Sequence, residues 1–232
     1  MLDFITKADY FSWMESFPLP RRGNIKDVQD GFILSLLHDA KGQRVLEMGG
    51  GDSRLLRHLA PTNECWNVEK FQGVDGGPGK EVVIPEVRNV HAFMGEFSLE
   101  LPEAYFDVAV SISVVEHIGD EAVIKAFRDI ARVLKPGGIA PHAIDMYLLT
   151  RDHPHQAQVE RRVRLYLSIA EACGLRLRSA PAVAASPRFD SAYATNSDLA
   201  MFHWNSVAPS LKSLREQAQG CSLKCIWEKP AD

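Results

Sequence analysis

The hydrophobic and polar positions of the chain change their pattern near residue 41. Residues 25–40 repeat apolar side chains at the 3.6-residue spacing of an amphipathic helix, and residues 8–17 place bulky side chains at helical spacing. Beyond this point, short apolar runs alternate with helical stretches. We therefore expect a single domain in two regions, a helical cap or lid at residues 1–40 and a main region at residues 41–232.

Seven segments of the main region have the composition of β-strands. They are residues 44–48, 64–69, 89–95, 105–113, 137–145, 175–183 and 221–229. Helices are expected between them, most clearly at 121–135 and 155–173. Alternation of strands and helices indicates parallel β-α-β units, whereas the last segment alternates apolar and polar residues as an antiparallel or edge strand does. The predicted fold is α/β, a doubly wound, mostly parallel seven-stranded sheet whose last strand is antiparallel.

Composition narrows the class of protein. The 232 residues are 46% apolar and 24% charged with a formal net charge of −4, which is ordinary for a globular domain and argues against nonspecific binding to nucleic acid. No apolar stretch is long enough to span a bilayer, and the N-terminus lacks the features of a signal peptide. Cysteines 65, 173, 221 and 225 have no metal-binding spacing, so we expect reduced thiols in a cytoplasmic protein.

The stretch VLEMGGGDSRLL at residues 45–56 places three glycines directly after the first main-region strand. Such a turn lets a ligand approach the backbone at the carboxyl end of the strand, where open α/β sheets bind ligands. Dinucleotide-binding turns read G-x-G-x-x-G, but Arg54 stands at the third glycine position, and Glu47 would repel a pyrophosphate. These two residues argue against a nicotinamide-dependent reductase and favour a cationic ligand.

The pattern Glu47-x-Gly49-x-Gly51-x-Ser53 resembles the E/D-x-G-x-G-x-G motif of class I S-adenosylmethionine-dependent methyltransferases, with Ser53 in place of the third glycine. Further stretches resemble this family in the expected order: Glu69 after the second strand, Gly95-Glu96-Phe97 after the third, LPEAYFDVAVSISVVEHI at 101–118 and LKPGG at 134–138. The resemblance covers residues 44–146. It implies a Rossmann-like methyltransferase fold, S-adenosylmethionine as cofactor and S-adenosylhomocysteine as product.

The resemblance also implies roles for particular residues. Glu47 would anchor the positively charged methionine end of the cofactor, Glu69 would accept hydrogen bonds from the ribose hydroxyls, and Glu96 would meet the adenine amino group. The full set of expected cofactor-binding residues is Glu47, Gly49, Gly50, Gly51, Ser53, Glu69, Lys70, Glu96, Phe97 and Ser111.

Methyl transfer to a hydroxyl requires a base as well as alignment of donor and acceptor. His117, which follows the fourth strand, is the first candidate, although it could instead cap or pack against the adjoining helix. His142 and Asp145, near the end of the fifth strand, are the next candidates. A metal site is an alternative use of Asp145, Asp152, His153 and His155, but histidines in polar loops are more often solvent-exposed, and we predict no metal.

The acceptor side has weaker signals. One aromatic group, Tyr10, Phe11, Trp13 and Phe17, lies in the N-terminal region, and a second lies at residues 202–204. Each is either a lid over the acceptor or ordinary core. The polar stretch at residues 186–198 is either a specificity loop or a surface connection.

The function expected from these features is O-methylation of a small molecule, such as a sugar, glycan or natural-product intermediate. We expect a monomer or homodimer with no nucleic-acid or membrane partner. One alternative is a methyltransferase acting on protein or nucleic acid, although SISVVEHI at 111–118 lacks the Asn/Asp-Pro-Pro-aromatic element of many nucleic-acid enzymes. The other is a cofactor-binding module without turnover.

Overall fold

The computed structural model describes residues 1–17, 25–73, 77–150, 152–184, 187 and 218–231. Its strands are β1 (Leu2–Phe4), β2 (Arg44–Met48), β3 (Glu64–Val68), β4 (Val87–Val90), β5 (Phe106–Ile112), β6 (Leu134–Leu149), β7 (Arg176–Leu177) and β8 (Ala218–Glu228). Its helices are α1 (Lys7–Ser16), α2 (Ile25–Leu37), α3 (Arg54–Leu59), α4 (Asp120–Val133) and α5 (Gln156–Cys173), with a short 3₁₀ helix η2 at Val115–His117.

The strands form one mixed sheet in the order β1-β8-β6-β5-β2-β3-β4, with β7 also paired to β8. The pairs among β2, β3, β4, β5 and β6 are parallel, whereas β8 runs antiparallel to β1, β6 and β7. This confirms the predicted α/β class, the mostly parallel sheet and the antiparallel last strand. The strand order reverses between β2 and β5, and the ends of those strands are therefore the place where a ligand is expected.

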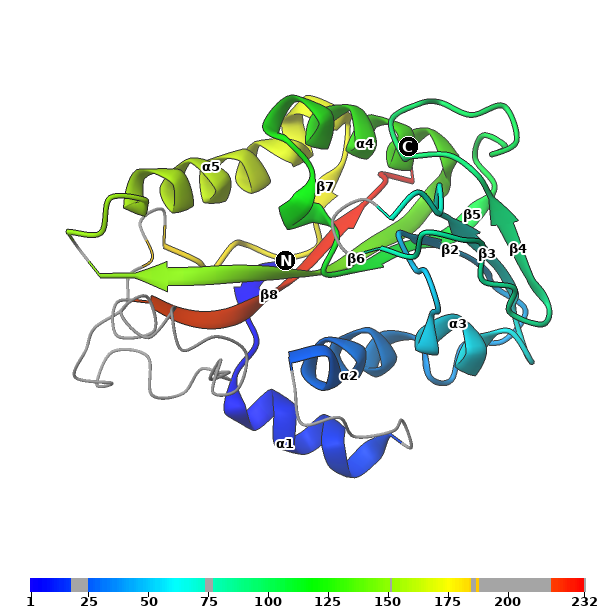
Figure 1. The fold of residues 1–232 in the computed structure, drawn as a ribbon, viewed down its shortest axis with the longest axis horizontal. Coiled ribbons are helices and arrows are strands. Elements are labelled where there is room, and N and C mark those ends of the chain that lie inside the picture. The colour runs from blue at the N-terminus through cyan, green and yellow to red at the C-terminus, as the bar shows by residue number, and fades with distance from the viewer. Residues whose placement is uncertain (18–24, 74–76, 151, 185–186, 188–217, 232) are drawn as a thin grey trace.

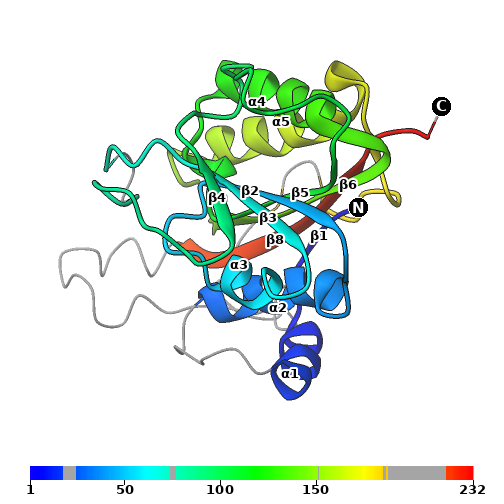
Figure 2. The same cartoon turned by 90° about the vertical axis from the view of Figure 1, so that its right-hand side faces the viewer.

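Helices cover both faces of the sheet (Figures 1 and 2). Helices α4 and α5 lie on one face over a core that includes Phe127 and Trp227, and α2 and α3 lie on the other over a core that includes Phe32 and Leu56. Because the central strands are buried on both sides, they read as continuous apolar runs in the sequence. The two apolar layers hold the carboxyl ends of β2 and β5 in fixed positions.

The N-terminal region pairs with the main sheet and packs against its core. β1 pairs with β8, with Leu2 opposite Cys225, and α2 contributes Phe32 to the core beneath the sheet. The Trp13 ring packs 6.1 Å from that of Phe32, centroid to centroid, and Tyr10 and Phe17 pack against the same core. Their helical spacing therefore reflects packing between α1 and the core.

The largest differences from the predicted strand bounds are in β6, β4 and β7. β6 begins at Leu134, before the Pro-Gly-Gly turn that was expected to precede it, and the Gly137 N–H donates to Lys229 O at 2.9 Å. The third and sixth predicted strands shrink to β4 and β7. Within the described residues, no helix is long and apolar enough to cross a membrane.

Candidate active site

A cavity of about 520 Å³ opens at the carboxyl ends of β2 and β5. Of the residues predicted to bind a cofactor, it is lined by Glu47, Gly49, Gly50, Ser53 and Glu69. His117 also lines it, and this is the only one of the three candidate bases to do so. The volume lies in the usual range for small-molecule sites, about 300–1,000 Å³.

The glycine turn brings the backbone to the cavity wall. Gly49 has a φ of +67°, which disfavours a side chain, and its N–H donates to Val68 O at 2.9 Å. A Cβ at Gly50 would lie 2.8 Å from both Asn67 Oδ1 and Glu47 Oε2. A side chain at Gly50 would therefore collide with the residues that hold the turn, and Gly51, with a φ of +53°, completes it.

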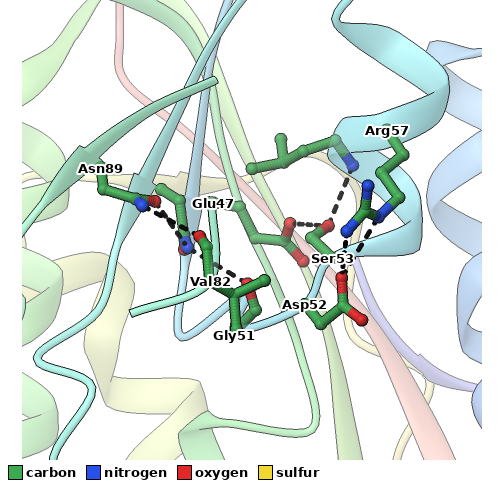
Figure 3. Close-up of polar contacts among 9 residues, drawn as sticks. Glu47, Gly51, Asp52, Ser53, Arg57, Val82 and Asn89 are labelled. Atoms are coloured by element: carbon green, nitrogen blue, oxygen red, sulfur yellow. Dashed lines mark hydrogen bonds and ion pairs between the residues drawn. The ribbon is translucent and has the colours of Figure 1, made fainter. Parts of the chain in front are cut away.

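Glu47 lies one residue before the end of β2, in the cavity wall, with only 4% of its surface exposed. Burial raises the pKa of its carboxyl group to about 7. The Ser53 hydroxyl donates to this carboxylate and accepts the Leu56 N–H at 2.9 Å, which caps α3 (Figure 3). Serine in place of the third glycine thus links the acid to the following helix.

The turn is also held from β3. The buried Asn67 side chain accepts the Gly50 N–H at 3.1 Å and lies 3.3 Å from Asn89 Oδ1. Figure 3 shows Asn89 reaching toward the turn from the next strand, and its amide donates to Val82 O at 3.0 Å. On the other side, Asp52 pairs with Arg57 of α3.

The beginning of α2 adds charges to the cavity that were not predicted. Lys26 and Asp30 line it, and Asp30 forms a bidentate pair with Arg54 at 2.7 and 2.9 Å. Together with Glu47, these groups provide two carboxylates and two cations around one end of the cavity. An amino-acid group carries both an ammonium and a carboxylate, so the methionine end of S-adenosylmethionine fits this set. Helical spacing in α2 identified its apolar face but gave no signal for these polar positions.

The second predicted cofactor contact also lies at the cavity. Glu69 follows β3, and its Oε1 accepts the Phe71 N–H at 3.0 Å. An apolar wall is formed nearby by Phe93 and Met94, which suits a nucleoside base. The carboxylate, the glycine turn and this wall together match the chemistry of the cofactor that the family resemblance implies.

Lys70, Glu96 and Phe97 lie outside the cavity lining. Lys70 pairs with Glu96 and sits 4.6 Å from the centroid of the Phe93 ring, and this hydrogen bond lowers the pKa of the Glu96 carboxyl. The Phe97 N–H donates to the buried carboxylate of Asp129 at 3.1 Å, and its side chain is exposed. The predicted acid of this loop therefore supports the rim, while Phe93 and Met94 face the cavity.

The prediction of His142 as a candidate base requires correction, and the Ser111 side chain lies beside it. Both are fully buried, and Ser111 Oγ lies 2.7 Å from His142 Nδ1. The His142 ring packs between Phe127 and Trp227, at centroid distances of 5.0 and 5.8 Å. Burial lowers the pKa of His142 to about 3, which keeps the imidazole neutral. Because neither side chain reaches the cavity, His142 cannot serve as a base for a bound acceptor.

The other two candidate bases, His117 and Asp145, differ in their exposure to the cavity. His117 ends η2 with about half of its side chain exposed (49%) at the cavity. Asp145 is half-buried on β6 and accepts a hydrogen bond from Ser113, a lining residue, at 2.9 Å. The Glu116 carboxylate, whose Oε1 lies 3.9 Å from His117 Nε2, has no hydrogen-bond partner among the described residues. Burial, followed by the charge of Asp145, raises the pKa of Glu116 to about 8.

The remaining acceptor-side predictions have mixed outcomes. Phe11 is exposed, and none of the N-terminal aromatic side chains lines the cavity. The aromatic group at 202–204 and nearly all of the polar stretch at 186–198 lie outside the described residues. Among the described residues, no group of three or more His, Cys, Asp or Glu side chains is arranged to hold a metal ion.

Comparison with known proteins identifies the family to which this chain belongs. The sequence profile of the methyltransferase domain family matches residues 22–174, about two thirds of the chain, and the protein therefore belongs to that family. It is an S-adenosylmethionine-dependent methyltransferase with a Rossmann-like fold. No curated protein sequence matches it significantly.

Solved structures show the same fold at low sequence identity. The YcgJ protein of Bacillus subtilis is 15% identical with a TM-score of 0.54, over 88% of this chain and 98% of that one. The [4+2]-cyclase SpnF is 15% identical with a TM-score of 0.53, over 89% and 83%. Phosphoethanolamine N-methyltransferase 2 of Haemonchus contortus, solved with phosphomonomethylethanolamine and S-adenosylhomocysteine, is 16% identical with a TM-score of 0.53, over 86% and 52%.

Proposed function

We propose that this methyltransferase transfers the methyl group of S-adenosylmethionine to a hydroxyl group of a small molecule, such as a sugar, glycan or natural-product intermediate. The observation that carries the proposal is a single cavity that joins Glu47 and the glycine turn to Ser113 and His117. A sulfonium is a strong electrophile, so the protein mainly has to align the acceptor and exclude water. If the methyl group goes to a hydroxyl, a second group must take the hydroxyl proton. His117 lines the cavity, and Asp145 is hydrogen-bonded to the lining residue Ser113.

The small size of the acceptor is supported by the cavity and by composition. A volume of about 520 Å³ must hold both the cofactor and the reacting part of the acceptor. The net charge of −4 does not favour a polyanionic acceptor. Because folds of this kind host different reactions, as the cyclase SpnF illustrates, the reaction itself has to be tested directly.

The first experiment tests the cofactor site by calorimetry with S-adenosylmethionine. Glu69→Ala is expected to weaken binding by about tenfold or more, because a charge-assisted hydrogen bond to ribose is lost. Glu103→Ala, which removes an exposed glutamate away from the cavity, is the control and should bind like the parent. Equal affinities in both variants would remove Glu69 from the site.

The second experiment identifies the acceptor class. The protein is incubated with methyl-labelled S-adenosylmethionine and a cell extract, and the products are separated by size. The proposal predicts label in small molecules whose new methyl group resists mild acid and base, as an ether does. Label confined to large species would favour a protein or nucleic-acid modifier, and tight cofactor binding without any transfer would favour a binding module.

A further inference from the structure

Ser113 has an unusual backbone for its residue type. It directly follows β5, lines the cavity and has a φ of +51°. Residues other than glycine rarely adopt this conformation, and such strain concentrates at functional sites. The Ser113 N–H donates to Ala143 O at 2.9 Å, which holds the residue beside β6. The strained residue therefore belongs to the cavity lining, and its hydroxyl contacts groups from α2 and β6.

The Ser113 hydroxyl meets two other oxygen atoms. Its Oγ lies 2.8 Å from Gln29 Oε1 and 2.9 Å from Asp145 Oδ1. The orientation of the Gln29 amide is set by its nitrogen, which donates to Asp145 and, at 3.0 Å, to Ser222 Oγ. Gln29 is fully buried, so these contacts are not replaced by bulk water.

The two oxygen–oxygen contacts of Ser113 Oγ have only one proton between them. A serine hydroxyl has a single proton, whereas Gln29 Oε1 and ionised Asp145 Oδ1 are both acceptors. The hydroxyl can satisfy only one of them at a time. If Asp145 gained a proton, it would donate to Ser113 Oγ, and Ser113 would then donate to Gln29, so that every contact would be a hydrogen bond. The cluster is therefore arranged to receive one proton.

We propose that Ser113 accepts the proton of the acceptor hydroxyl and passes its own proton to Asp145, while Gln29 positions both groups. The inference rests on the proposed function and specifies its proton acceptor. The acceptor oxygen forms a bond to the methyl carbon, the methyl–sulfur bond breaks, and its electron pair remains on sulfur. The products are a methyl ether, neutral S-adenosylhomocysteine and protonated Asp145, which returns its proton to water before the next turnover. His117 then lines the cavity without receiving this proton.

The Asp145 carboxylate lies close to other titratable groups. Besides burial, the Asp145 carboxylate raises the pKa of Glu116, to about 8, and contributes to raising that of Tyr147, to about 12. A carboxylate so close to the cavity favours a positively charged group at the methyl position of the cofactor. This attraction can be measured without knowing the acceptor.

The test compares two cofactor analogues by calorimetry. Sinefungin carries an ammonium group on carbon where the cofactor has its methylsulfonium, whereas S-adenosylhomocysteine has no group at the methyl position. Asp145→Asn keeps the side-chain shape and is expected to weaken sinefungin by about tenfold, with S-adenosylhomocysteine changed less than about twofold. Ser113→Gly, which suits the positive φ, is expected to weaken sinefungin selectively by about threefold to fivefold.

Control variants define the remaining outcomes. Glu121→Gln, on the exposed side of α4, should retain the parent preference between the two analogues. An unchanged preference in both Asp145→Asn and Ser113→Gly would overturn the proposal, as would a preference lost only in His117→Gln. If the parent binds neither analogue, it is the proposed function that fails.

Discussion

Two serine pairs connect β5 to β6, and they differ chiefly in their access to the cavity. Ser111 lies inside β5 and contacts His142 at 2.7 Å, while Ser113 lies beyond the end of β5 and contacts Asp145 at 2.9 Å. The first pair is fully buried between aromatic rings. The second meets the cavity through Ser113.

The difference shows that hydrogen-bond geometry alone does not identify a functional pair. A Ser–His contact is a more familiar catalytic arrangement than a Ser–Asp contact. The His142 imidazole, however, is fully buried with a pKa lowered to about 3, so it cannot take a proton from a bound acceptor molecule. We therefore assign the Ser111–His142 pair to stability and the Ser113–Asp145 pair to proton transfer. Three predictions test this division, from the largest expected effect to the smallest.

Acid should remove the contribution that the buried Ser111–His142 pair makes to stability. The unfolded imidazole takes up a proton below pH 6.5, whereas the folded one, with a pKa of about 3, does not. The His142 contribution is therefore complete above pH 6.5 and is lost as the pH falls toward 3. At roughly 1.4 kcal/mol per pH unit, about 3 kcal/mol of unfolding free energy is lost between pH 7 and pH 4.

Urea unfolding of the parent and of His142→Asn at both pH values measures this loss. The variant serves as the reference because Glu47 and Glu116, with pKa values raised to about 7 and about 8, have the opposite dependence. Their contributions fall as the pH rises from 4.5 toward these values. Asp145→Asn should keep the acid sensitivity of the parent. If the parent and His142→Asn lost equal free energy in acid, the imidazole would not be sealed.

The Ser113–Asp145 pair, which meets the cavity, should control turnover. With an acceptor identified from the labelled extract, Asp145→Asn is expected to lower kcat by about 100-fold, since proton transfer to a positioned group contributes about 10²–10⁴. The unfolding free energy should change by less than about 1 kcal/mol, because asparagine has the same shape at a half-buried position. Steady-state kinetics and urea unfolding on the same preparation measure both, and an unchanged kcat would assign the proton to another group.

The two serines should respond differently to loss of the hydroxyl. Ser111→Ala leaves a buried imidazole nitrogen without its partner and is expected to cost about 1–2 kcal/mol of stability with kcat unchanged. Ser113→Gly relieves the positive φ while removing its contacts, so stability should stay within about 1 kcal/mol of the parent while kcat falls. Thermal unfolding and kcat are measured for both variants. Loss of kcat in Ser111→Ala but not in Ser113→Gly would reverse our assignment.

Much of the donor side could be predicted from the sequence because its residues are close together along the chain. Glu47, the glycines and Ser53 belong to one strand–turn–helix unit, whose geometry is local. The Ser53 substitution in the motif was visible as well, but its bond to Glu47 became apparent only from the fold.

The acceptor side could not be predicted in the same way. The cluster near the acceptor side combines residues from four distant elements: Gln29 of α2, Ser113 after β5, Asp145 of β6 and Ser222 of β8. No spacing along the chain indicates that these residues are in contact. Likewise, His142 and Asp145 both lie in the stretch HAID. Their sequence positions do not show that His142 is fully buried while Asp145 is only half-buried.

The sequence by itself determined the α/β class, the methyltransferase resemblance and the position of the cofactor turn, because hydrophobic periodicity and short-range turn geometry depend on neighbouring residues. The tertiary structure alone decided which polar side chains meet and which are removed from water. Proton affinity and access depend on burial and on partners distant in the chain, so the division between a structural pair and a reactive pair is a property of the folded molecule.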